Sequence, residues 1–251
     1  MNKEPINVYY TNDHGVLEVD DWEFLYPKPK TLFYELVKER KDTKDLRSFL
    51  HCPAVMPKFK KTLVFNNAIK SSYVYGRSGD GFYMNPTSES YINSFNVRRE
   101  TLTNKPTFQL SLSCLFFADT PLDVFFTGPY FHQPQYMKYG VCIPGEFDIG
   151  QWFRPFNFEF QTWSDSGEFH LEENEPLFYA DFKTERPIFF HRFSMTPELH
   201  KYKLASVTSI KLFGPFQTLA DKYEKFKQVG YREKILTEIK KNLIDEEPYR
   251  F

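Results

Sequence analysis

The stretch Phe108-Gln109-Leu110-Ser111-Leu112-Ser113-Cys114 decides the fold class. Apolar and small polar residues alternate along it, and this period of two places its Phe, both Leu and its Cys on one face of a β-strand. Strand-like runs continue as far as Phe193, separated by Pro, Gly, Asp and Ser. Many short strands with turn residues between them are typical of an antiparallel β-sandwich or a jelly-roll-like barrel. The sequence therefore predicts a mainly β fold with such a core.

Outside this region the sequence predicts hairpins and helices. Residues 73–75 and 82–84 are expected to pair across a tip at Gly79-Asp80-Gly81. Residues 6–10 and 16–24 have the pattern of an N-terminal hairpin, and Thr31 is placed to cap a helix over 32–40. Apolar residues at helical spacing predict a C-terminal pair of α-helices over 218–229 and 231–244.

We expect one domain, 1–251. It has a β core over about 52–193, the N-terminal hairpin and helix in 5–50, and the helical pair in 218–244. Aromatic residues make up 19% of the chain, with 28 Phe and 16 Tyr. Aromatic rings suit pleated, half-buried surfaces and bury a large area each. Because Phe exceeds Tyr, we expect core packing rather than a surface that stacks sugars or bases.

Charge argues against a nucleic-acid partner or an anionic membrane, because the net charge is −1 and the pI is about 6.6. The charge is nevertheless uneven. Residues 28–70 contain 11 Lys or Arg against 4 Asp or Glu, and residues 146–181 contain 9 Asp or Glu against Arg154 alone. These segments either dock on each other, form separate surfaces for a protein partner, or complement each other in a homo-oligomer. The sequence does not choose among the three.

Cysteine use indicates a reducing compartment. Cys52, Cys114 and Cys142 are widely spaced, and no CxxC or Cys/His ligand spacing occurs. We therefore predict buried free thiols rather than a disulfide framework or structural zinc. The chain begins with a polar segment, and no run approaches the roughly 18 apolar residues of a membrane span. We expect a soluble cytoplasmic protein that is not secreted.

A metal site is one hypothesis for function. His170-Leu171-Glu172 has the His-x-Glu spacing of the first ligand pair in mononuclear iron oxygenases, and His191 or His200 is then the third ligand. Such an enzyme would carry divalent iron on a double-stranded β-helix. The competing interpretation is a surface hairpin with a solvated histidine. A cupin site is excluded, because no His-x-His occurs among the six histidines.

Two further groups have structural interpretations that we favour. Cys52 beside His51 lacks any further signature of a nucleophile and its base, so buried packing is expected. A cluster of carboxylates on successive turns has the residue types of a cation site but no EF-hand pattern, so solvated turn charge is expected. The cluster comprises Asp165, Glu168, Glu172, Glu173 and Glu175.

Two segments are candidates for binding an organic ligand. Trp152-Phe153-Arg154-Pro155 combines aromatic rings with a guanidinium, which suits a ring-shaped ligand, although a rigid sheet corner explains the same residues. The glycine-rich run 76–81 contains Arg77 and Ser78 and invites comparison with phosphate-binding loops. It lacks the Lys-Ser/Thr of a Walker motif and opens no helix, so a hairpin tip is favoured. Trp152, Arg154, Arg77 and Ser78 are thus the candidate ligand-binding residues.

A resemblance rests on motifs between Cys52 and Phe193. Cys52-Pro53-Ala54 is followed by a lysine-rich strip and a strand. The later motifs are Phe126-Thr127-Gly128-Pro129, Gly145-Glu146-Phe147-Asp148 with Trp152-Phe153, and Glu175-Pro176. This arrangement resembles uncharacterised proteins of marine T4-like phages and a related bacterial family of unknown function.

Members of that bacterial family show a Gly-Pro after a strand, an Asp-Trp segment and a Gly-Glu-Pro turn. In this chain Asn174 stands where those members have Gly, and the segment from Gly145 to Trp152 is longer than their Asp-Trp. The resemblance implies a phage or bacterial origin, with the host cytoplasm or the virion as location for a phage protein. It carries over no catalytic residues.

The sequence favours a non-catalytic binding or assembly protein, because no strong catalytic constellation stands out. A protein partner or a homo-oligomer is expected, and no cofactor. The alternative is the iron-dependent oxygenase with His170 and Glu172 as first ligands. A further alternative is a nucleotide-handling enzyme that uses Arg77-Ser78-Gly79.

Overall fold

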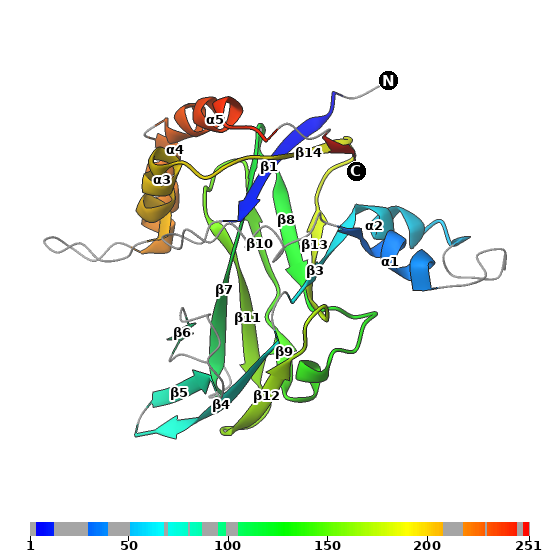
Figure 1. Cartoon of the computed structure of the whole chain (residues 1–251), viewed down its shortest axis with the longest axis vertical. Helices are drawn as coiled ribbons and strands as arrows, with labels where there is room; N and C mark the ends of the chain where they lie inside the picture. Colours follow the sequence, from blue (N-terminus) through cyan, green and yellow to red (C-terminus); the bar gives the residue numbers. More distant parts are fainter. Residues whose placement is uncertain are drawn as a thin grey trace, which may run out of the picture.

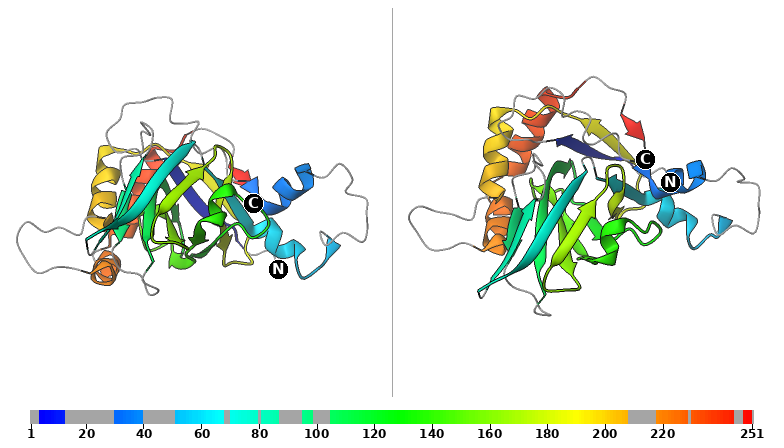
Figure 2. Two further views of the ribbon diagram at one scale, coloured as in Figure 1. Left: turned by 90° about the horizontal axis from the view of Figure 1, so that it is seen from below. Right: turned by 60° about the horizontal axis from the view of Figure 1, so that its bottom comes forward.

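The fold is mainly β, as the alternating pattern predicts. A computed structural model describes residues 4–12, 30–39, 51–67, 70–79, 81–86, 95–98, 105–207, 218–228, 230–244 and 248–250. Mainly antiparallel sheets form a sandwich-like centre, and helices flank it on opposite sides (Figures 1 and 2).

The strands are β1 Ile6–Asn12, β2 Lys30–Thr31, β3 Thr62–Asn66, β4 Ser71–Ser78, β5 Gly81–Pro86, β6 Phe95–Arg98, β7 Thr107–Ala118, β8 Asp123–Thr127, β9 Gly140–Cys142, β10 Gly145–Asp148, β11 Pro155–Thr162, β12 Gly167–Leu171, β13 Pro176–Phe182, β14 Ile188–Arg192 and β15 Tyr249–Arg250. The helices are α1 Leu32–Glu39, α2 Met56–Lys61, the 3₁₀ helix η3 Gln135–Lys138, α3 Pro197–Val207, α4 Leu219–Gln228 and α5 Tyr231–Lys241.

The described strands form three sheets. The seven-stranded sheet has the order β15-β14-β1-β7-β11-β9, with β6 also pairing to β7. The five-stranded sheet has the order β10-β8-β13-β3-β2, and the three-stranded sheet the order β12-β4-β5. Strand β1 runs parallel to β14 and antiparallel to β7.

The main core lies where these sheets face one another. Strand β7 points Phe108, Leu110, Cys114 and Phe116 into it, so the predicted face is confirmed for the described side chains. Aromatic rings dominate this core, and Phe116 stacks on Phe156 with ring centroids 4.8 Å apart. Such an aromatic pair stabilises the fold by about 0.5–1.5 kcal/mol beyond the contribution of its buried apolar area.

The opposite face of β7 is also buried, because helices cover it. Leu115 and Phe117 pack there with residues of the C-terminal helices, including Leu199 from α3, Phe226 from α4 and Ile235 from α5. The predicted helical pair is therefore confirmed as α4 and α5. Helix α3 was not predicted.

A smaller core joins α1 and α2 to the five-stranded sheet. Leu32, Phe59, Val64 and Tyr179 form it. The expected cap of α1 is present, because the Tyr34 backbone N–H donates to Thr31 Oγ1 over 2.9 Å. An uncapped N–H at this position would lose about 1 kcal/mol of helix stability.

Other predicted elements have mixed outcomes. Strands β4 and β5 form the expected hairpin, with Ser78 opposite Gly81. Strand β1 lies inside the seven-stranded sheet, between β14 and β7, and this placement in the central sheet was not predicted. The expected N-terminal hairpin is wrong for residues 6–10, because β14 and β7 occupy both edges of β1; its expected return strand over 16–24 lies outside the described residues.

Candidate functional site

The chain passes from the seven-stranded sheet to the five-stranded sheet between β9 and β10. Strand β9 pairs with β11 in the seven-stranded sheet, and the Ile143 N–H still donates to the Glu159 carbonyl over 2.8 Å. Two residues later Gly145 pairs with Phe126 of β8, in the five-stranded sheet. Pro144 stands at the change, where its missing N–H ends the first ladder. Strands that switch sheets at a bend are a known way to make the corner of a sandwich.

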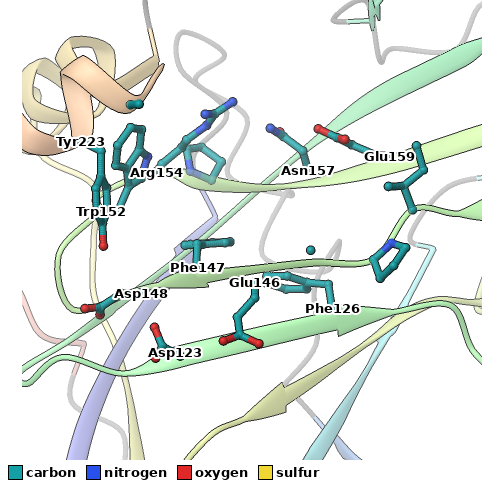
Figure 3. Close-up of a pocket in the computed structure, with 15 residues that line it drawn as sticks. Asp123, Phe126, Glu146, Phe147, Asp148, Trp152, Arg154, Asn157, Glu159 and Tyr223 are labelled. Atoms are coloured by element: carbon teal, nitrogen blue, oxygen red, sulfur yellow. The ribbon is translucent and has the colours of Figure 1, made fainter. Parts of the chain in front are cut away.

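A cavity of about 620 Å³ lies beside this crossing (Figure 3). Its size falls in the range of sites for small organic ligands. The walls come from β8 and β10 on one side, from β11 and the loop before it on the other, and from α4 at one end. The lining residues are Asp123, Phe126, Ile143, Pro144, Gly145, Glu146, Phe147, Asp148, Trp152, Arg154, Pro155, Asn157, Glu159, Ala220 and Tyr223.

Aromatic rings form much of the wall. Trp152 stacks on Tyr223 of α4, with ring centroids 4.7 Å apart and an interplanar angle of 27°. Phe147 stacks on Phe126 at 5.4 Å and meets Phe156 of the core edge-on. Trp152 is buried, and no described residue accepts a hydrogen bond from its Nε1.

The charges of the lining are mainly negative. Asp123, Glu146, Asp148 and Glu159 stand against the single guanidinium of Arg154. Asp148 also holds the following turn, because its Oδ1 accepts from the N–H groups of Leu122 (2.8 Å) and Gly150 (2.7 Å).

The hydroxyl of Tyr223 has a raised pKa in this environment. Burial is the main cause that raises the pKa of Tyr223 to about 12, and the negative charges of Asp148 and Asp123 add to it. Tyr223 therefore remains neutral at physiological pH and can donate or accept a hydrogen bond.

Two cations lie at the α4 end. With the Asn157 amide oriented so that its oxygen accepts, Arg154 Nη2 donates to it over 3.1 Å. Lys222, next to Tyr223 in α4, is 9% exposed, and its Nζ has no hydrogen-bond partner among the described residues. Burial lowers the pKa of Lys222, and the charge of Arg154 lowers it further.

The ligand-binding candidates from the sequence separate into two places. Trp152 and Arg154 both line the cavity. Arg77 and Ser78 lie on the exposed end of β4 in the three-stranded sheet. There Arg77 pairs with Asp165 (Nε–Oδ2 3.3 Å) and lies over the ring of Phe82.

The metal-ligand candidates are not brought together. His170 Nδ1 hydrogen-bonds Ser72 Oγ at 2.7 Å in the three-stranded sheet, whereas His191 lies on β14 of the seven-stranded sheet. Glu172 pairs with Lys70 at 2.8 Å, and His200 lies on α3. No group of three or more His, Cys, Asp or Glu among the described residues is arranged to hold a metal ion. The geometry gives the proposed iron site no support.

The acidic turns and the cysteines also have ordinary surroundings. Asp165 accepts from Lys105 and Arg77, which together hold the pKa of its carboxyl below the usual value. Cys114 and Cys142 are buried free thiols, as predicted, whereas Cys52 is only half-buried. The prediction of full burial for Cys52 is wrong, because it lies just before α2 near the protein surface.

The basic and acidic segments meet in part. Strand β3 of the basic segment pairs with β13 of the acidic one. The ion pair between Lys70 and Glu172 joins the same two segments at the three-stranded sheet. Their contact is thus made mainly by strand pairing and burial.

Sequence reasoning missed the other walls of the cavity. Tyr223 is on a helix far along the chain, and Asp123 and Glu146 are on neighbouring strands. The available signal was Pro144-Gly145, which breaks a strand-like run just before an acidic and aromatic segment.

Comparisons with known proteins add no assignment. No family model, curated protein or solved structure matches the chain. None of the described helices has the length and apolar character needed to cross a membrane.

Proposed function

We propose that this protein is a non-catalytic binding protein whose cavity between β10, β11 and α4 takes a positively charged ligand with an apolar group. The observation that supports this most is the composition of the lining: four aromatic side chains, four carboxylates and one guanidinium. Aromatic faces and carboxylates both attract cations, and the rings also bury apolar parts of a ligand.

Arg154 does not offset this preference in full, because its single positive charge stands against four carboxylates in the lining. Asp148 is partly committed to backbone N–H groups. Asp123 and Glu146 are exposed and therefore remain available to a ligand. The acidic wall of β8 and β10 is opposite Arg154 and Asn157 on the β11 wall (Figure 3).

The other hypotheses gain no comparable support. An oxygenase needs three converging ligands, and a nucleotide site at the β4–β5 hairpin would have to compete with Asp165 for Arg77. A phage origin stays a prediction.

Ligand binding can be tested by thermal shift and calorimetry. The set contains tyramine, agmatine and arginine amide, with p-cresol and adenosine monophosphate as neutral and anionic comparisons. A ligand that binds only the native state raises the melting temperature. We expect the cations to bind and the anion not to bind.

The matched variants are Glu146→Gln with Asp123→Asn, and Glu168→Gln with Glu173→Gln as control. All of these side chains are exposed. Each partly exposed charge contact contributes about 0.2–1 kcal/mol, so the loss of two contacts should make the first double variant bind cations about two- to thirtyfold more weakly. Equal weakening in both double variants, or tighter binding of the anion, would contradict the proposal.

A further inference from the structure

The outer edge of β10 has backbone groups that point away from its sheet. The Ile149 N–H donates to the Leu122 carbonyl over 2.9 Å, in register with the pairing of β10 and β8. Hydrogen-bonded pairs alternate along an antiparallel ladder, so Gly145 and Phe147 bond to β8. The N–H groups of Glu146 and Asp148 therefore point outward, toward the side of the cavity.

These outward groups lack partners among the described residues. No described group bonds to the N–H of Glu146 or Asp148, nor to the Glu146 carbonyl; the Asp148 carbonyl accepts only from the Gln151 N–H, at 3.3 Å. Strand β10 is also the last described strand on its side of the five-stranded sheet. An unpaired strand edge is a template for an added strand.

Side chains along this edge define what an added strand would carry. Glu146 and Asp148 are on one face of β10, next to Asp123 of β8, which is opposite Asp148. Phe147 is on the other face and contacts Phe126 inside the cavity. Residues directly opposite each other on paired strands share a face. An added strand would thus place residues opposite the two acids on an acidic face, and the residue between them on an apolar one.

We propose that β10 binds an extended segment of a partner protein with the pattern cation–apolar–cation, which adds to the sheet as an antiparallel strand. This rests on the proposed function and specifies its ligand. The antiparallel direction is that of every described ladder in the five-stranded sheet. The apolar residue enters the cavity beside Phe147, and the two cations are opposite Glu146 and Asp148.

A second copy of this chain is disfavoured as the occupant. Antiparallel pairing of two β10 strands about Phe147 would put Glu146 of each opposite Asp148 of the other. Like charges directly opposite each other destabilise a strand pair. The charge of the edge therefore selects a basic partner and rejects self-pairing.

The test uses fluorescein-labelled acetyl-Thr-Arg-Val-Arg-Thr-amide and its isomer acetyl-Thr-Val-Arg-Arg-Thr-amide, measured by fluorescence anisotropy with the full chain. The alternating peptide should bind about tenfold or more tightly than the isomer. N-methylation of both Arg residues should remove binding, because their N–H groups face β10. N-methylation of Val should be tolerated, because its N–H points away.

Variants of Glu146 separate the backbone contribution from the charge. Glu146→Pro removes an outward N–H without breaking the ladder to β8, and Glu146→Gln removes the charge alone. Binding should fall further in Glu146→Pro than in Glu146→Gln, at melting temperatures within a few degrees of each other.

The outcomes also separate this inference from the proposed function. Equal binding of both peptides and of arginine amide, insensitive to N-methylation, would overturn strand addition while leaving the cavity as a site for small cations. A dimer of the free chain in light scattering that the peptide dissociates would assign the edge to a second copy and overturn the basic partner. Absence of binding by every cationic probe would overturn both.

Discussion

Replacing Lys222 by methionine is expected to stabilise the protein. The side chain is 9% exposed, and no described residue accepts a hydrogen bond from its Nζ. Arg154, a second cation, is close enough to lower the pKa of Lys222 beyond the lowering that burial causes. A buried ammonium without a partner is destabilising at neutral pH, and a nearby guanidinium adds repulsion.

The size of the effect follows from this geometry. A buried donor without a partner costs about 1–3 kcal/mol. Methionine keeps the unbranched stem and has a helix propensity close to that of lysine, so other terms change little. For a chain of this length, each kcal/mol corresponds to about 2–4 °C in melting temperature. Lys222→Met should therefore melt about 2–12 °C higher at pH 7.

The pH dependence of the stability gain tests whether the charge of Lys222 is its cause. Because the pKa of Lys222 is lowered from 10.5 in the folded protein, the unfolded state binds the proton more readily. The destabilisation is fully present below the lowered pKa and fades as pH rises toward 10.5. The gain in unfolding free energy of Lys222→Met should thus be largest at neutral pH and shrink at alkaline pH.

Urea denaturation at pH 7, 9 and 10 measures this gain, with Lys240→Met as control because Lys240 is exposed on α5. The control should change the unfolding free energy by less than about 0.5 kcal/mol. A Lys222→Met variant no more stable than the wild type at pH 7, or one whose gain does not shrink with pH, would refute the reasoning.

Three more outcomes are expected. Gly150→Ala should lose about 1–3 kcal/mol, since a Cβ there would collide with backbone, whereas Gly145→Ala, with open space around it, should change stability little in the same denaturation assay. An aromatic disulfide reagent should modify Cys52 in the native protein but Cys142 only after unfolding, because Cys142 is buried and burial raises its pKa to about 12; fast reaction of both thiols would contradict this. Wild-type stability should fall between pH 10 and about 12, where unfolded tyrosine ionises and folded Tyr223 does not; Tyr223→Phe should reduce that slope in pH-dependent unfolding.

Sequence patterns predicted elements whose cause is local. The alternation in β7 reports a strand whose two sides differ in composition, and the spacing of Ile235 and Ile239 reports the buried stripe of α5. Helix α3 was not predicted, because Leu199 is the one large apolar side chain that is buried among its described residues. A single buried residue does not produce an apolar stripe in the sequence. The position of β1 in the sheet was not predicted for another reason. Its parallel pairing to β14 joins residues about 180 positions apart, such as Ile6 and Ile188, and local sequence patterns carry no information on such a pairing.

The candidate site was predictable only where its residues are close together in the sequence. Trp152 and Arg154 are close in sequence and combine an aromatic ring with a guanidinium, so the local sequence pattern was enough to predict them as ligand-binding candidates. Tyr223 joins them only through the packing of α4. His170 and Glu172 had an equally good local pattern, yet their third ligand needed a distant strand to converge, and β14 lies in a different sheet. Spacing fixes neighbours along a strand and does not fix which strands face each other.

The cavity and the unpaired edge have one structural origin. If β9 continued beyond Pro144 along β11, Gly145 would pair with Asn157, and the acidic residues of β10 would lie inside the seven-stranded sheet. Because the chain instead joins β8, Asn157 and Arg154 line the cavity on the β11 side, and β10 faces them with N–H groups that have no partner among the described residues. The same crossing therefore supplies the volume, the charge and the backbone donors that strand addition needs. Binding of a basic strand should protect the N–H groups of Glu146 and Asp148 from hydrogen exchange and leave those of Gly145 and Phe147, already bonded to β8, nearly unchanged; equal protection along β10 would show that the ligand acts through general stabilisation instead.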